Sequence, residues 1–189
     1  MRFITALLSL IALLASPASA HTAAGSGFAF LDGILHPLMG ADHLLVMIGV
    51  GLWAGMTGGK ARWIWPVAFV SVMAVGGAAA LAGMNLWFAE GLILASVAAI
   101  GAVVGLGLQP PVVIGAIACG LAAFAHGHAH GTELPLGASA VGYVAGFLTA
   151  TVALHVSGII MWSAAGHSKV LARAAGIATV AAGGLLAFG

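Results

Sequence analysis

Six apolar stretches, each close in length to a membrane-spanning helix, constrain the fold of this 189-residue chain more than any other feature. A helix needs about 20 apolar residues to cross the hydrocarbon core of a bilayer. Glycine, proline and polar residues separate the stretches, which run over residues 31–56, 63–84, 86–108, 112–129, 138–163 and 170–188. The sequence therefore predicts an all-α, polytopic membrane protein whose six transmembrane helices form one bundle and leave no room for a soluble domain.

The composition of the chain excludes several other classes of protein. Hydrophobic residues make up 62% of the sequence and charged residues 5%, whereas about a quarter of the residues in soluble domains are charged. The net charge of +1 is too small for a nucleic-acid footprint, so we expect a lipid bilayer as the surroundings and no nucleic acid as a partner. The single cysteine, Cys119, excludes an intramolecular disulfide and a cysteine-rich metal site.

The first 20 residues have the pattern of a cleavable signal peptide. Arg2 precedes an apolar run over residues 4–15, and residues 16–20 end in an Ala-x-Ala cleavage pattern. The run is too short for a spanning helix. We therefore predict a signal peptide over residues 1–20 and a six-helix transmembrane domain over residues 21–189. Cleavage would leave His21 at the N-terminus, either as a metal-chelating group or as the start of a mobile tail.

The lysines and arginines predict the orientation of the bundle. Lys60 and Arg62 follow the first expected span, and Lys169 and Arg173 lie where the sixth begins. Basic residues concentrate on the cytoplasmic side of a membrane. A signal peptide gives the same orientation independently, because it exports the start of the mature chain. We therefore expect the mature N-terminus outside the cell membrane, and the first span to begin at the outer face.

Two short motifs gather most of the ionisable side chains of the chain. Residues 36–43 read HPLMGADH and residues 126–133 read HGHAHGTE, and together they hold five of the eight histidines and two of the four carboxylates. An ionisable side chain near the centre of a membrane helix costs about 2.5 to 3.5 kcal/mol on insertion scales. Imidazole and carboxylate groups together are suitable ligands for a borderline divalent metal ion. The topology places both motifs in the outer half of the bundle.

The spacing within the first motif predicts a bend in the first span. His36 and His43 lie on nearly the same face of a helix, but seven residues rise by about 10 Å, too far for both rings to meet one ion. Either the chain bends near Pro37, with His36 just before a helix start, or there are two binding stations. Asp42 is a direct ligand, an acceptor that fixes the tautomer of a histidine on a neighbouring helix, or half of a structural pair with His43.

The second motif allows two backbone conformations. In a helix, His126, His130 and Glu133 share one face, and His128 points elsewhere, toward an outer vestibule. In an extended segment, the three histidines alternate onto one side together, and the two glycines of the motif permit either backbone. A loop that binds metal weakly, or only buffers protons, is the alternative to a defined site.

Three further side chains are candidates outside the motifs. Glu90 is either a companion ligand or a helix-end residue that reaches to the membrane interface. His155 either relays an ion or a proton inward or is a hydrogen-bonded core histidine. Cys119 lies seven residues before His126 and therefore on the same face of a helix. It is a soft second station or, as we expect, a small core residue.

These features together resemble the HupE/UreJ family. The resemblance covers the signal, the six helices and the patterns HPxxGxDH and HGxxHGxE, which are residues 36–43 and 126–133 here. It implies secondary nickel permeases of the bacterial inner membrane, in some members cobalt permeases, that supply hydrogenase or urease maturation. It implies no prosthetic group and no enzymatic activity, with maturation proteins as downstream partners. At the positions of this sequence that match the family's patterns, the resemblance implies the following metal-site residues: His36, Asp42, His43, His130 and Glu133, with Glu90 as a companion.

Some properties stay open at this point. No Walker-type nucleotide motif occurs in the sequence, which favours either diffusion down a gradient maintained by trapping or coupling to protons. The ligand types do not distinguish Ni²⁺ from Co²⁺ or Zn²⁺. The alternatives to a permease are a metal-binding accessory or sensor protein and a membrane metallo-oxidase built on a histidine cluster.

Overall fold

The computed structural model describes residues 28–134 and 138–188, and this part of the chain is all-helical, as predicted. The predicted signal peptide and His21 lie outside the described residues. The helices are α2 (Ala29–Met39), α3 (Ala41–Thr57), α4 (Ala61–Leu81), α5 (Ala89–Leu106), α6 (Val112–Thr132), α7 (Ala140–Ala164) and α8 (Lys169–Phe188). By length and composition, α4 to α8 can each cross a membrane, and α2 and α3 together pass the same test as a pair bent by 83°. The chain is thus a multi-pass membrane protein, and its first apolar stretch is divided into two helices.

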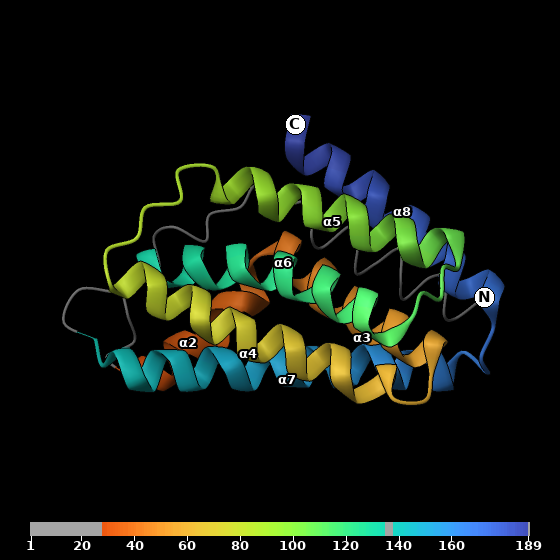
Figure 1. Cartoon of the computed structure of the whole chain (residues 1–189), viewed down its shortest axis with the longest axis horizontal. Coiled ribbons are helices and arrows are strands. Elements are labelled where there is room, and N and C mark those ends of the chain that lie inside the picture. Colours follow the sequence, from red (N-terminus) through yellow and green to blue (C-terminus); the bar gives the residue numbers. More distant parts are fainter. Residues whose placement is uncertain (1–27, 135–137, 189) are drawn as a thin grey trace.

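Helix α3 is the central element of the bundle. It contacts α2, α4, α5, α7 and α8, and most of its side chains are buried. The remaining helices pack in pairs: α4 lies along α6, α5 lies along α8, and α7 lies along α2 and α3. Figure 1 shows α5 and α8 side by side at one edge and α7 at the opposite edge.

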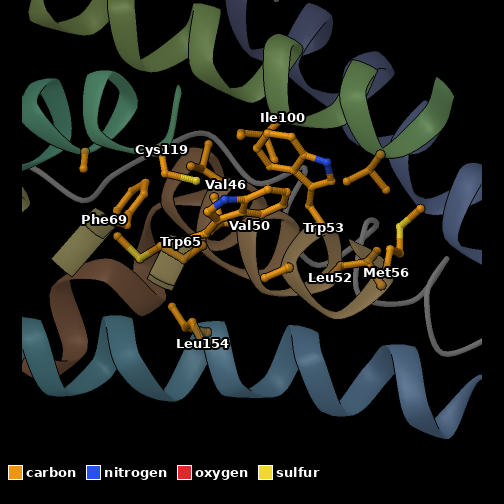
Figure 2. Packing of buried hydrophobic residues seen from close by; sticks show 14 of the residues in the cluster. Val46, Val50, Leu52, Trp53, Met56, Trp65, Phe69, Ile100, Cys119 and Leu154 are labelled. Atoms are coloured by element: carbon orange, nitrogen blue, oxygen red, sulfur yellow. The ribbon is translucent and has the colours of Figure 1, made fainter. Parts of the chain in front are cut away.

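Aromatic side chains fill the core along α3. Trp53 and Trp65 are buried with their rings 4.1 Å apart, and Phe69 follows one turn of α4 beyond Trp65. Figure 2 shows these three rings in succession among Val46, Val50 and other aliphatic residues. Cys119 belongs to this cluster and is fully buried, in agreement with a small core residue.

The connection between α5 and α6 is held firmly against this aromatic core. The indole N–H of Trp53 donates to the Leu108 carbonyl (2.7 Å), and that of Trp65 donates to the Val112 carbonyl (2.8 Å). The Gln109 amide donates to the carbonyl of Met56 at the end of α3 (2.8 Å). These bonds satisfy polar groups that would otherwise be unpaired at a membrane helix end.

The two ends of the bundle differ in charge. A pocket at the end that holds the α5–α6 connection is lined by Gln109, Lys169 and Arg173, and Lys60 lies just after α3 ends. The carboxylate Glu133 caps α6 at the other end. The predicted separation of basic residues from the second motif is therefore present in the fold.

Glycines let the helix pairs approach closely, as small residues do in membrane proteins. At Gly76 on α4, an added Cβ would meet the carbonyl of Phe124 and lie 3.0 Å from the backbone nitrogen of His128 on α6. On α5, a Cβ at Gly101 would lie 3.0 Å from the carbonyl oxygen of Gly176 on α8. Backbone atoms cannot move aside as a flexible side chain can, so these contacts fix the helix separations.

We predict that Gly76→Ala destabilises the bundle. The new methyl group must push α4 away from α6, and overpacking of this kind costs about 1 to 3 kcal/mol. Thermal unfolding of the purified protein in detergent should show a melting temperature several degrees lower. Gly184→Ala on α8 is the matched control, because nothing lies within 4 Å of a Cβ there. Equal melting temperatures for the two variants would contradict the close packing of α4 on α6.

Candidate metal site

The break between α2 and α3 brings the two histidines of the first motif together. Gly40, between the two helices, has an extended conformation (φ −89°, ψ 118°). The rings of His36 and His43 lie 6.4 Å apart across the bend. The predicted bend exists, but Pro37 lies within α2, and His36 is in the last turn of that helix. The prediction that a helix begins just after His36 is therefore wrong.

The position of the break follows from the contacts of Gly40. A Cβ on this residue would lie 2.8 Å from His43 Nδ1 and 2.9 Å from Asp42 Oδ1. The space that a side chain would need is thus occupied by the Asp42–His43 pair. A proline within a helix removes one backbone hydrogen bond, but here it does not end the helix.

Asp42 orients the ring of His43. Its Oδ1 accepts hydrogen bonds from the His43 backbone N–H (2.8 Å) and from His43 Nδ1 (2.6 Å). A carboxylate in the first turn of α3 also interacts favourably with the helix dipole. With the proton on Nδ1, neutral His43 presents the lone pair of Nε2, which is buried. Asp42 is therefore an acceptor for a histidine of its own helix, not of a neighbouring one.

The second motif is helical, because α6 continues to Thr132. This excludes the extended alternative for the motif. His130 and Glu133 lie on the face that meets α2: Glu133 Oε2 is 2.9 Å from His36 Nε2 and 3.8 Å from His130 Nδ1. One ligand atom from each of these three residues lies within 4.8 Å of the other two. The structure thus brings two imidazoles and a carboxylate from both motifs together at one end of the bundle.

The imidazoles continue inward from this group. The ring of His43 lies 4.4 Å from the ring of His130 and 4.9 Å from that of His126. His126 Nδ1 is 2.9 Å from the Ala122 carbonyl oxygen. A carbonyl only accepts, so Nδ1 carries the proton and Nε2 is free to bind a metal.

Several of these ring nitrogens are buried without a hydrogen-bond partner. Among the described residues, they include Nε2 of His43, Nε2 of His126 and both ring nitrogens of His130. A buried polar group left unpaired costs about 1 to 3 kcal/mol. A divalent cation would satisfy such lone pairs, and a set of donors made of imidazole nitrogens and a carboxylate suits a borderline metal ion.

Aromatic side chains, which the sequence interpretation did not include, surround the imidazoles. The Phe147 ring lies 4.0 Å from the His130 ring, and the Tyr143 ring lies 6.0 Å from the His36 ring. Tyr143 and Phe147 are one turn apart on α7, and that spacing is the only signal in the sequence that could have identified them. They exclude water from one side of the site.

Two predicted site residues lie apart from this group. His128 is buried, and its Nε2 donates to the carbonyl of Met84 in the α4–α5 connection (2.8 Å), so an orientation toward an open vestibule is wrong. Glu90 is exposed in the first turn of α5. The metal-binding group found among the described residues contains neither side chain.

Fold and site together define a multi-pass helical membrane protein with a buried cluster of imidazoles and a carboxylate near one end. The chain belongs to the HupE/UreJ family: the family model described as HupE / UreJ protein matches residues 8–186. The Protein HupE of Rhizobium leguminosarum bv. viciae is 46% identical over 184 residues, which cover 95% of each chain. No solved structure matches the chain.

We predict that Asp42→Asn weakens metal binding by about 10- to 100-fold, the usual effect of removing the partner that orients a ligating histidine. The neutral amide oxygen can still accept both hydrogen bonds, but it accepts them more weakly than a carboxylate and carries no negative charge to stabilise a charged or metal-bound His43. Calorimetric titration of the purified protein with Ni²⁺ measures the change. An unchanged melting temperature would show that the fold is intact, and an unchanged affinity would rule out this role of Asp42.

Proposed function

We propose that this protein is a secondary transporter that moves a divalent transition metal ion, Ni²⁺ or else Co²⁺, from the periplasm to the cytoplasm. The observation that carries this proposal is a group of three potential ligands, His36, His130 and Glu133, from which buried imidazoles continue into a membrane bundle. The family supports the same function, because HupE/UreJ proteins are associated with nickel and cobalt uptake for hydrogenase or urease. Maturation proteins of such an enzyme would receive the metal.

The charge distribution supports the direction of transport. The end with Lys60, Arg62, Lys169 and Arg173 is assigned to the cytoplasm, because basic residues concentrate there. The end with Glu133 then faces the periplasm of a bacterial inner membrane. A signal peptide over residues 1–20 would agree with this orientation.

The ion is captured first at the periplasmic end. The side chains of His36 and Glu133 are 18% and 26% exposed, so an ion can reach them, whereas His130 is buried behind them. Glu90, exposed where α5 begins, adds negative charge near this entrance. Because the side chains of His36 and Glu133 are still in contact with water, the ion loses its own hydration shell in steps as it binds.

The ion then passes to the buried ring nitrogens of His43 and His126. Asp42 compensates the positive charge through His43, since a buried charge without compensation is costly in a membrane. His128 holds the α4–α5 connection through Met84 and lies beside the route. Mixed nitrogen and oxygen ligands bind more weakly than thiolates bind soft metals, which permits release on the inner side.

Direct uptake of ⁶³Ni²⁺ into proteoliposomes tests this function. We predict uptake by the wild type and at least about a tenfold lower rate for Glu133→Gln, because the amide offers no negative charge to a cation. His167→Asn is the matched control: this histidine is exposed at the basic end, and its variant should transport at the wild-type rate.

The same preparation distinguishes the alternatives. Metal binding without uptake by the wild type would favour an accessory or sensor protein. Oxygen consumption by the iron-loaded protein would favour a metallo-oxidase. Uptake of Co²⁺ or Zn²⁺ in preference to Ni²⁺ would correct the substrate but leave a transporter.

A further inference from the structure

His155 is a buried histidine on α7 that belongs to neither motif. Its side chain is 1% exposed, and its Nδ1 lies 2.7 Å from the carbonyl oxygen of Met47 on α3. A carbonyl can only accept a hydrogen bond, so Nδ1 carries the proton. The other nitrogen, Nε2, is buried and has no hydrogen-bond partner among the described residues.

This arrangement repeats that of the two histidines within the proposed route. In His43, His126 and His155 alike, Nδ1 is held by an oxygen acceptor and Nε2 is buried without a partner. A ligating histidine in a metalloprotein almost always donates its second ring N–H to a carboxylate or a carbonyl, which fixes the ring and its tautomer. Most buried polar groups in native structures are paired, so a ring nitrogen left free calls for an explanation such as a ligand. His128 also has one such nitrogen, Nδ1, but that side chain lies beside the route.

His155 also lies next to the inner end of the imidazole series. The Phe69 ring is 5.8 Å from the His126 ring and 5.0 Å from the His155 ring, nearly perpendicular to the latter. Both imidazoles therefore contact the same phenyl ring, although they come from α6 and α7. Phe147, Thr151 and His155 follow one another at intervals of four residues on α7, so they lie on one face of this helix. That face is directed at the route.

We propose that Nε2 of His155 is an inner binding station for the transported divalent metal ion, which it receives from His126 past the Phe69 ring. The proposal rests on the transport function above and adds a ligand from α7 to a route otherwise built from α2, α3 and α6. A neutral imidazole nitrogen suits a borderline divalent ion. One such ligand in apolar surroundings binds weakly, as a station before release requires.

His155→Asn tests this station. The asparagine amide can replace Nδ1 as the donor to the Met47 carbonyl, but it has no nitrogen lone pair in place of Nε2. We predict that Ni²⁺ affinity measured by calorimetry stays within about twofold, since the outer group is intact, while ⁶³Ni²⁺ uptake falls at least about tenfold. His167→Asn, the same change at an exposed position, should leave both values unchanged.

The outcomes separate this proposal from the transport function. If the wild type takes up no metal ion, the transport function itself is wrong, and the station with it. If the wild type transports Ni²⁺ and His155→Asn does so at the same rate, only the inner station is overturned. Should His155→Asn not elute and melt as the wild type does, the same comparison with His155→Gln decides the question, because glutamine likewise lacks the lone pair.

Discussion

The break at Gly40 is the constraint on which the candidate metal site depends. In a straight helix the rings of His36 and His43 would be separated by about 10 Å of rise, whereas the bend of 83° brings them to 6.4 Å. A break within a membrane span frees backbone groups that must find partners in the protein. The carboxylate of Asp42 accepts from one of them, the His43 N–H, and orients the His43 ring with the same oxygen. The site and the helix end are thus stabilised by one side chain.

Hydrogen bonds to one nitrogen of each ring explain how the protein keeps imidazoles available in an apolar interior. An oxygen holds Nδ1 of His43 and of His126, which determines where each lone pair is presented. The free nitrogens destabilise the fold by about 1 to 3 kcal/mol each, and the aromatic core and the close helix packing offset this cost. Such unpaired groups are rare in proteins and are expected where a ligand binds.

The sequence predicted the apolar helices and the separation of the basic residues from the second motif, because hydropathy and charge follow regular patterns. That His36 lies beside His130 and Glu133 is known only from the fold. The predicted position of the break, near Pro37, was wrong, because the break lies at Gly40. Proline is the stronger local signal in the sequence, and the contacts that require Gly40 are formed only after folding. Likewise, a single histidine such as His155 carries no periodic signal. Its partner Met47 is distant in sequence, and only the packing of α7 on α3 brings them together.

The structure exposes the candidate metal site toward one end of the bundle and covers it toward the other. His36 and Glu133 are partly exposed, whereas the tilted, contacting indoles of Trp53 and Trp65 are buried on the side of the basic residues. The Trp53 indole also donates to Leu108 in the α5–α6 connection, and the Trp65 indole donates to Val112 in the first turn of α6. Hydrogen bonds as well as packing therefore close that end. Under the proposed transport function, an ion that leaves through this end would require the α5–α6 connection to separate from α3 and α4. Because interfaces of this kind switch between packed arrangements rather than deform gradually, we expect the outward-accessible and inward-accessible states of the proposed transporter to differ at the Trp53–Trp65 contact.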